Sequence, residues 1–352
     1  MRKTKSNRKS DLEQFNDMNL PVDLVKLPSC GKLYGPDNYF YNKTFIDYKP
    51  MTARQEDILL NASYRKKGKA IEEMISSCLL EPGVNLDELL TGDRDALMVS
   101  IRISGYGAAY EPTYACPHCE HKNEINFDLT GIGIKFLELE PHVPGQNLFK
   151  FILPKSKHEV LFRFITVADE RNLLRLSKKE NSGIGTVTAQ LLNSIVQIDE
   201  QTDLFEIQKL IQKMSAYDSL HLRTYIDKHQ PGLEMNIDFQ CDSCAYSNKI
   251  NIPTNHDFFS LGPEHRELVF LEPFFLLTYY VGMDWATYLK FPLQYRKWLI
   301  ERVNKEVKSA VDANKKGGGD VPSKGAHHND PTTRALSGKQ RPITPSKLRR
   351  FS

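Results

Sequence analysis

The sequence predicts an α+β protein built from two diverged repeats, each with helices followed by a small antiparallel hairpin that resembles a zinc ribbon. Three observations support this fold class. Amphipathic helical patterns recur in the same order in both halves of the 352-residue chain, two Cys-x-x-Cys pairs follow them, and short alternating segments flank each pair. A chain of this length can bury the cores of two ordinary domains.

The first matching segments are residues 51–60 (MTARQEDILL) and residues 165–174 (ITVADERNLL). Each places a threonine ahead of an acidic residue and then a pair of leucines. Thr52 with Gln55, and Thr166 with Asp169, have the spacing of residues that cap the N-terminus of a helix. We therefore expect a helix to begin after each threonine.

Two further helices continue the match. Residues 71–79 (IEEMISSCL) align with residues 188–196 (TAQLLNSIV), and both segments carry apolar residues at helical spacing. A third helix is expected to begin near Asp95 in the first repeat and near Asp218 in the second. A short strand then leads into each cysteine pair, and another strand leaves it.

The offset between the repeats drifts from 114 residues (Thr52 to Thr166) to 125 residues (Cys116 to Cys241). A few loop insertions explain this drift. The shared order of helices, strand, cysteine pair and strand favours a duplication over chance similarity.

Four cysteines are the candidate metal ligands: Cys116, Cys119, Cys241 and Cys244. A Cys-x-x-Cys turn lets two thiolates reach one ion, and a closed structural zinc site has four ligands. The two pairs can therefore converge on a single Zn²⁺ between the repeats. Such a site would join distant parts of the chain and contribute directly to folding.

Three alternatives to a shared zinc site remain open in the sequence. His118 and His121 flank the first pair and could complete a separate site, although the second pair has no nearby histidine before His256. Reduced cysteines without metal are the second alternative. A redox role is the third, but thioredoxin-like chemistry uses a motif that opens a helix. Cys30 and Cys78 are expected to be unrelated, with Cys78 in the core.

Charge is distributed unevenly along the chain. Residues 1–10 carry +5 and residues 312–352 carry +6, so the total of +3 leaves −8 for residues 11–311. An acidic folded part argues against a broad nucleic-acid-binding surface, although the basic ends leave weak electrostatic docking open.

The basic N-terminus is not followed by an apolar stretch, so it is not expected to be a signal peptide. The longest apolar-rich run, residues 268–281, contains Glu272 and Pro273 and is shorter than a membrane-spanning helix. We interpret that run as part of the core and expect no membrane span.

Signatures of common enzymes are missing from the sequence, which contains no dinucleotide-binding glycine motif, Walker A loop, His-Glu-x-x-His or Gly-x-Ser-x-Gly. Four cysteine ligands would also leave a zinc ion without an open coordination position. The prediction is a protein without catalytic residues and without a small-molecule substrate.

An aromatic-rich segment follows the second repeat and leads into a helix from about Pro292. The expected apolar stripe of this helix comprises Tyr295, Trp298, Leu299, Val303 and Val307. Beyond about residue 312 the composition changes to a flexible linker rich in Gly and Lys.

The basic end of the chain is either a docking peptide or a solubilising tail. Its candidate partner-binding residues are Leu336, Ile343, Leu348, Arg349, Arg350 and Phe351. The predicted divisions are a basic flexible arm (1–20), the first repeat (21–140), the second repeat (141–260), an aromatic-rich helical segment (261–311) and a flexible basic tail (312–352).

Several segments resemble the baseplate hub and hub-assembly proteins of T-even-like contractile-tailed bacteriophages. The segments that carry the resemblance are residues 27–35, 51–59, 93–119, 239–259, 270–285, 291–306 and 344–351. The family implies a non-enzymatic structural or assembly role in the hub of the tail baseplate. It implies other phage baseplate or hub proteins as partners, and a location in the host cytoplasm during assembly or in the virion tail baseplate.

A zinc-ribbon protein that binds nucleic acid or acts in transcription is the alternative function. Both ends of the chain are basic, which favours it. The cysteine pairs themselves are nearly free of basic residues, with Lys122 after the first and Lys249 after the second. We therefore do not expect nucleic acid as the partner. A metalloenzyme ranks last, because it would need an open zinc position.

Overall fold

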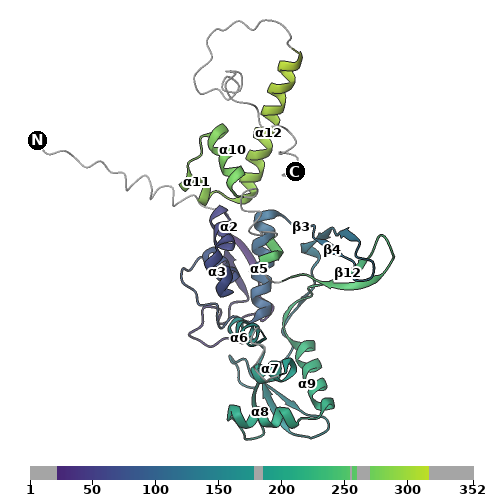
Figure 1. Cartoon of the computed structure of the whole chain (residues 1–352). Coiled ribbons are helices and arrows are strands. Elements are labelled where there is room, and N and C mark those ends of the chain that lie inside the picture. Colours follow the sequence, from purple (N-terminus) through teal and green to yellow (C-terminus); the bar gives the residue numbers. More distant parts are fainter. Residues whose placement is uncertain (1–21, 178–184, 254–255, 260–269, 317–352) are drawn as a thin grey trace, which may run out of the picture.

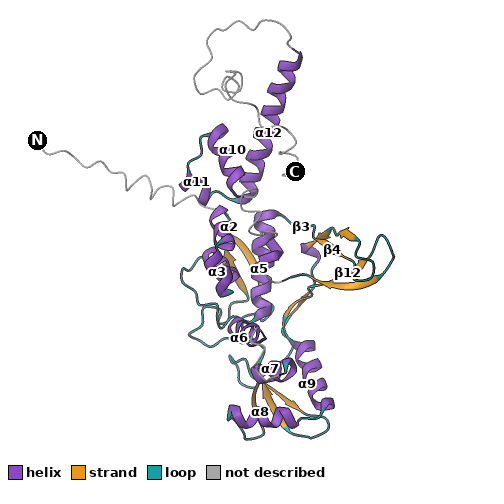
Figure 2. Cartoon of the chain, viewed as in Figure 1, coloured by secondary structure: helices purple, strands orange, loops and turns teal. Residues whose placement is uncertain are grey.

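The computed structural model describes residues 22–177, 185–253, 256–259 and 270–316. Helices and small antiparallel sheets are arranged along an elongated molecule (Figures 1 and 2), which agrees with the predicted α+β class. Within the described residues no helix is long and apolar enough to cross a membrane.

The N-terminal half begins with an antiparallel hairpin and continues with helices. Its elements are β1 (Asp23–Lys26), β2 (Phe45–Tyr48), α2 (Ala53–Leu60), α3 (Ala62–Lys67), α4 (Ala70–Cys78), α5 (Thr91–Tyr106), β3 (Ala109–Tyr110), β4 (Thr113–Ala115), β5 (Lys122–Glu124), β6 (Phe127–Asp128), the 3-10 helix η2 (Leu129–Gly131) and β7 (Ile134–Lys135).

The next part of the chain also begins with an antiparallel hairpin and also contains four α-helices among the described residues. Its elements are β8 (Phe149–Ile152), β9 (Glu159–Phe162), α6 (Val167–Ser177), α7 (Thr186–Ser194), β10 (Ile195–Ile198), α8 (Leu204–Lys213), α9 (Ala216–His229), β11 (Gly232–Leu233), β12 (Asn236–Gln240), β13 (Ser247–Asn251) and η3 (His256–Phe259). Strands β8, β9 and β10 form a three-stranded sheet.

Both predicted helix caps are confirmed. The Thr52 backbone N–H donates to Gln55 Oε1 at 2.9 Å, and Thr52 Oγ1 accepts from Arg54, which completes a capping box at α2. At α6 the Thr166 N–H donates to Asp169 Oδ2 at 2.9 Å, and the Asp169 N–H donates to Thr166 Oγ1 at 3.4 Å. Each cap was predicted from two residues three positions apart, and the structure contains both caps.

Helix α5 begins at Thr91, four residues before the predicted start near Asp95. Its first turn contains Asp93, a fully buried residue whose carboxylate accepts the N–H and hydroxyl of Ser29 and the hydroxyl of Tyr34. Burial raises the pKa of Asp93, so these donors are needed to keep the carboxylate in the core.

The second half has the same type of contact at Asp218, whose carboxylate accepts the N–H of Lys155 at 2.8 Å and that of Ser156 at 3.2 Å. Both acids therefore hold the loop that follows the first strand of their half. The acid with this contact in the first half is Asp93, whereas the sequence alignment placed Asp95 opposite Asp218.

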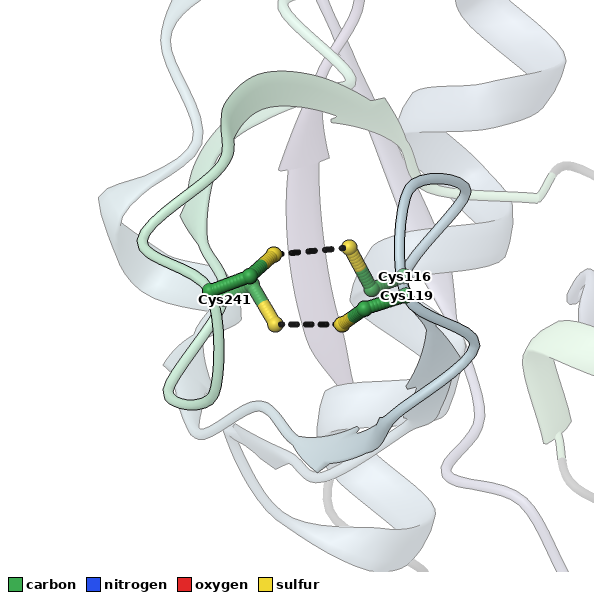
Figure 3. Close-up of side chains that lie close together, drawn as sticks. Cys116, Cys119 and Cys241 are labelled. Atoms are coloured by element: carbon green, nitrogen blue, oxygen red, sulfur yellow. Dashed lines mark hydrogen bonds between the residues drawn. The ribbon is translucent and has the colours of Figure 1, made fainter.

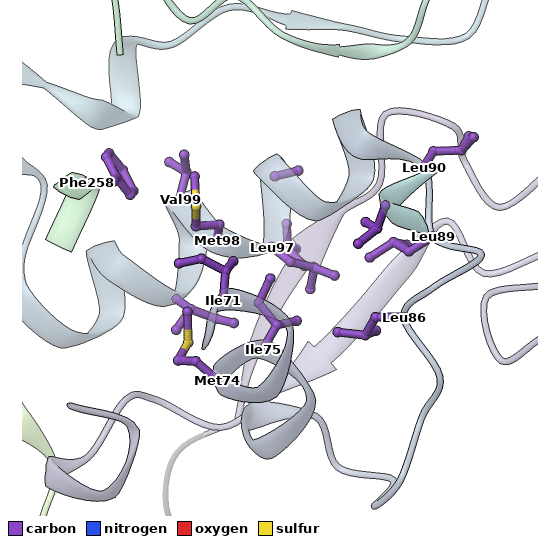
Figure 4. Close-up of a cluster of buried hydrophobic side chains, with 14 of the residues drawn as sticks. Ile71, Met74, Ile75, Leu86, Leu89, Leu90, Leu97, Met98, Val99 and Phe258 are labelled. Atoms are coloured by element: carbon purple, nitrogen blue, oxygen red, sulfur yellow. The ribbon is translucent and has the colours of Figure 1, made fainter. Parts of the chain in front are cut away.

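One hydrophobic cluster runs through the described helices and sheets. Figure 4 shows its centre, where Ile71, Met74 and Ile75 of α4 face Leu97 of α5. Cys78 is 1% exposed and belongs to this cluster, as predicted, and burial raises the pKa of its thiol to about 12. The helices near α5 therefore pack against one another through buried apolar side chains.

The C-terminal described elements are α10 (Glu272–Val281), α11 (Trp285–Lys290) and α12 (Leu293–Lys316). The predicted apolar stripe on α12 was wrong in part, because Tyr295 is 50% exposed and Trp298 is 61% exposed. The buried positions are Leu293, Arg296, Ile300 and Val303. Arg296 faces inward although it is charged, and it forms an ion pair with the buried Glu56.

Candidate metal centre

Each cysteine pair lies in a tight turn between two antiparallel strands. Strands β4 and β5 pair from Thr113–Glu124 to Ala115–Lys122, and β12 and β13 pair from Asn236–Asn251 to Gln240–Ser247. The hairpins place both cysteines of a pair on one tight loop, as the alternating strands predicted.

The two turns are closed by the same hydrogen bonds. In the first turn, the Cys116 N–H donates to the His121 carbonyl and the Glu120 N–H donates to the Cys116 carbonyl, both at 2.9 Å. The second turn repeats both bonds at 2.9 Å, from Cys241 to Tyr246 and from Ala245 to Cys241. Glu120 and Ala245, at the same place in each turn, have left-handed φ angles of 59° and 56°. The two loops therefore present their sulfurs in the same way.

The turns face each other and bring the four sulfurs together (Figure 3). Cys116 Sγ lies 3.8 Å from Cys244 Sγ, and Cys119 Sγ lies 3.6 Å from Cys241 Sγ. All four sulfurs lie within 4.8 Å of one another. A tetrahedral ion with metal–sulfur bonds of about 2.3 Å holds its sulfurs about 3.8 Å apart. The spacing fits such an ion and is much longer than the ~2.0 Å of a disulfide.

Asn123 connects the two turns from within the site and is 3% exposed. Its Nδ2 donates to the His121 carbonyl at 3.0 Å and lies 3.7 Å from Cys241 Sγ, while its Oδ1 accepts from the Asp242 N–H at 3.0 Å. Groups that hold metal ligands in place in this way tune both geometry and affinity. We did not select Asn123 from the sequence, although an asparagine follows both pairs at the same spacing (Asn123 and Asn248).

Aromatic contacts complete the interface between the hairpins. Tyr114 and Phe239 meet edge to face with ring centroids 4.9 Å apart, and His118 stacks on Tyr246 at 5.9 Å. His118 is thus occupied by a ring contact, and the His121 carbonyl closes the first turn. Neither histidine belongs to the cysteine cluster, which among the described residues brings both cysteine pairs into one group of candidate ligands.

The thiols of the second pair differ in acidity. Desolvation opposes ionisation of Cys241, but the backbone N–H groups of Cys244 and Ser243 and the nearby thiols outweigh it and lower its pKa to about 6. For Cys244, the backbone N–H of Tyr246 favours ionisation, but desolvation and the neighbouring thiols raise its pKa to about 12. Four ionised thiolates at these distances repel one another, so full deprotonation requires a bound cation.

The arrangement can join two segments of the chain. Cys116 and Cys241 are buried, whereas Cys119 is exposed and Cys244 is half-buried. A site closed by four cysteines is typical of structural rather than catalytic metal.

The other predicted site residues lie outside the described part of the chain. These are the six candidate partner-binding residues of the tail: Leu336, Ile343, Leu348, Arg349, Arg350 and Phe351. The basic arm at residues 1–20 also lies outside it.

Comparison with known proteins gives one match. A protein-family model described as T4 bacteriophage base plate protein matches residues 23–260. No curated protein and no solved structure matches the chain. The matched range runs from β1 to η3, so it includes both cysteine turns and excludes α10, α11 and α12.

Proposed function

Because the chain belongs to the family of T4 bacteriophage base plate proteins, we propose that it builds or helps to assemble the central hub of the tail baseplate, with its two halves joined by one structural Zn²⁺. The family indicates a structural protein of the baseplate. The hub position, the zinc ion and the internal duplication are our proposals. The single observation that carries the zinc proposal is the convergence of two cysteine pairs from distant parts of the chain.

Zinc is favoured over other ions by the ligand set. Four thiolates at tetrahedral spacing suit Zn²⁺, whereas Mg²⁺ and Ca²⁺ prefer oxygen ligands. Bound zinc would supply no reaction chemistry here, because the four cysteines would fill its coordination sphere. Its role would be to hold the β4–β5 hairpin against the β12–β13 hairpin.

Support for the duplication comes from a docking contact that occurs twice. In the first instance the start of α5 docks on the start of α6. Leu90 pairs with Thr166, the Thr91 N–H donates to the Ile165 carbonyl at 3.3 Å, and Arg94 forms an ion pair with Glu170.

In the second instance the start of α12 docks on the start of α2. Thr52 pairs with Pro292, and the Leu293 N–H donates to the Met51 carbonyl at 3.2 Å. Arg296 then forms a bidentate ion pair with Glu56, at 2.5 and 2.7 Å.

In both instances the accepting helix has a threonine at its cap and a glutamate four residues later, and these pairs lie 114 residues apart in sequence (Thr52 to Thr166). The docking helix contributes an arginine four residues after its bridging residue. The recurrence of the whole contact supports two related repeats, at about 21–140 and 141–260.

The same comparison suggests a role for the helical segment at 261–311. Helix α12 fills the docking site of the first repeat as α5 fills that of the second. Arrays of repeats need terminal elements that cover the last docking surface. We propose that α10, α11 and α12 form such a cap, and that the tail beyond residue 312 docks on another baseplate or hub protein.

A phage that carries an early stop codon in the gene for this protein tests the proposed function. We expect tails without complete baseplates by electron microscopy, and restoration of baseplates when the protein is supplied from a plasmid. Normal baseplates in the mutant would contradict a role in the hub. Mass spectrometry of purified wild-type virions distinguishes the two proposed roles, because a hub component is present in the virion and an assembly factor is absent from it.

A further inference from the structure

A basic cleft lies where the turn between α3 and α4 faces α6, and it encloses about 340 Å³. Six cationic side chains and only two carboxylates line it: Arg65, Lys66, Lys67, Arg94, Arg171 and Arg175 against Glu72 and Glu170. In Figure 1, α3 and α6 lie across α5 from the β4 and β12 hairpins that carry the cysteines. The cleft is therefore a surface separate from the candidate metal centre.

Both carboxylates of the cleft form ion pairs, and each of the two arginines also pairs with a second carboxylate. Arg94 pairs with Glu170 and, at 2.7 Å, with Asp95. Arg171 lies 2.7 Å from Asp87 and 3.6 Å from Glu72. These two arginines are structural, because each ties helices of the body together.

Three cations of the rim, Lys66, Lys67 and Arg175, are exposed to solvent. Lys66 and Lys67 are exposed and form no ion pair within the described residues. Arg175 makes one long hydrogen bond, at 3.4 Å, to Asn172. The rim therefore keeps a local positive charge on a folded part that is acidic as a whole.

One further feature favours a negatively charged group at this place. Helix α4 begins at the cleft, and its N-cap residue Lys69 makes no side-chain hydrogen bond to the first turn. The partial positive charge of the helix N-terminus therefore lies beside the lysines.

The cleft also has an apolar side, which narrows the class of ligand. Ile71 and Val167 are 9% and 1% exposed, while Leu174 is 57% exposed at the surface. A phosphate backbone offers no apolar group to contact the exposed Leu174. A peptide can place an apolar side chain against Leu174 and its own carboxylates against the basic rim.

We propose that this cleft binds an acidic peptide segment of a partner protein, with carboxylates against Lys66, Lys67 and Arg175 and an apolar side chain against Leu174. The inference adds a partner chemistry to the structural role proposed above. It does not depend on the metal, so a failed zinc prediction would leave it untouched.

The test uses the full-length protein and a fluorescent oligoglutamate peptide with a central leucine, measured by anisotropy at low and physiological salt. The variant Lys66→Glu/Lys67→Glu reverses two exposed charges of the rim. The matched control Lys305→Glu/Lys308→Glu makes the same charge change at two exposed lysines of α12. We expect the rim variant to weaken peptide binding at least about tenfold and the control to change it less than about twofold.

Added salt should weaken binding to the wild-type protein, because the rim charges are exposed. A second probe, a single-stranded DNA oligonucleotide of equal charge, separates peptide from nucleic acid. Tighter binding of the oligonucleotide that is lost in the rim variant would overturn the peptide assignment. Peptide binding that is weakened equally by both variants, or no peptide binding at low salt, would overturn the site itself.

Discussion

The two places where distant parts of this chain meet are built on different principles. The helical body, comprising α2 to α6 and α10 to α12, is held by one extensive hydrophobic cluster and by buried ion pairs. The hairpin unit, comprising residues 113–124 and 236–251, has a small cluster whose buried members are Cys116, Phe239 and Cys241. A unit with so little apolar burial needs an additional constraint to stay folded. We therefore expect the body and the hairpin unit to unfold separately.

Loss of metal is the largest expected effect and should be confined to the hairpin unit. Apparent metal-binding free energies in zinc-finger peptides are about 10–16 kcal/mol, more than any single contact supplies. In the Cys241→Ser variant we expect amide hydrogen exchange to become fast in residues 113–124 and 236–251 and to stay slow in α4 and α5. The control Cys30→Ser changes a cysteine outside the cluster and should leave both regions protected. Continued protection of the hairpin unit in Cys241→Ser would contradict the comparison.

The second effect should be confined to the helical body. Glu56 is fully buried, accepts from the Tyr106 hydroxyl at 2.8 Å and pairs with Arg296. Removal of one partner of a buried pair leaves an uncompensated charge, so Glu56→Ala should lower the free energy of unfolding by about 3–5 kcal/mol. Both tryptophans of the chain, Trp285 and Trp298, lie in α11 and α12, so fluorescence during urea unfolding reports on this docking.

The matched variant is Glu170→Ala, at the corresponding contact of α5 and α6. Glu170 is 33% exposed and Arg94 keeps Asp95 as a partner, so the expected loss is about 1 kcal/mol or less. Equal losses in the two variants would show that burial does not set the strength of these contacts.

A smaller effect is expected from the group that orients the ligands. Asn123→Ala should weaken metal binding about 10–100-fold, because it removes the donor that joins the two turns. Asn248 has the same position after the second pair, but it is exposed and its side chain only accepts from Lys249. Competition with a chromophoric chelator should therefore show unchanged metal affinity for Asn248→Ala. Similar losses of metal affinity in both variants would contradict the role assigned to Asn123.

The smallest effect on stability is expected from the tail. A chain that ends at residue 316 should keep the tryptophan-monitored unfolding midpoint of the full protein, because the described core lies within residues 22–316. It should capture less of a baseplate or hub partner in a pull-down. A shifted midpoint, or capture equal to that of the full chain, would contradict the proposed docking role of the tail.

The sequence was sufficient for features that depend on local spacing. The threonine caps, the core position of Cys78 and the family resemblance required only neighbouring residues, and the cysteine pairs gave a specific ligand pattern. Features that depend on contacts between distant residues were missed. Arg296 was missed because its partner Glu56 lies 240 positions earlier in the sequence. Asp93 was passed over for the same reason, because its donors lie 59 and 64 positions away.

The most direct test of the shared metal site is the zinc content per chain, measured by elemental analysis on the wild-type protein and on a Cys116→Ser/Cys119→Ser variant. We predict one zinc per chain in the wild type and none in the variant, because the second pair alone supplies only two ligands. Two zinc ions in the wild type and one in the variant would contradict a site shared between the two halves.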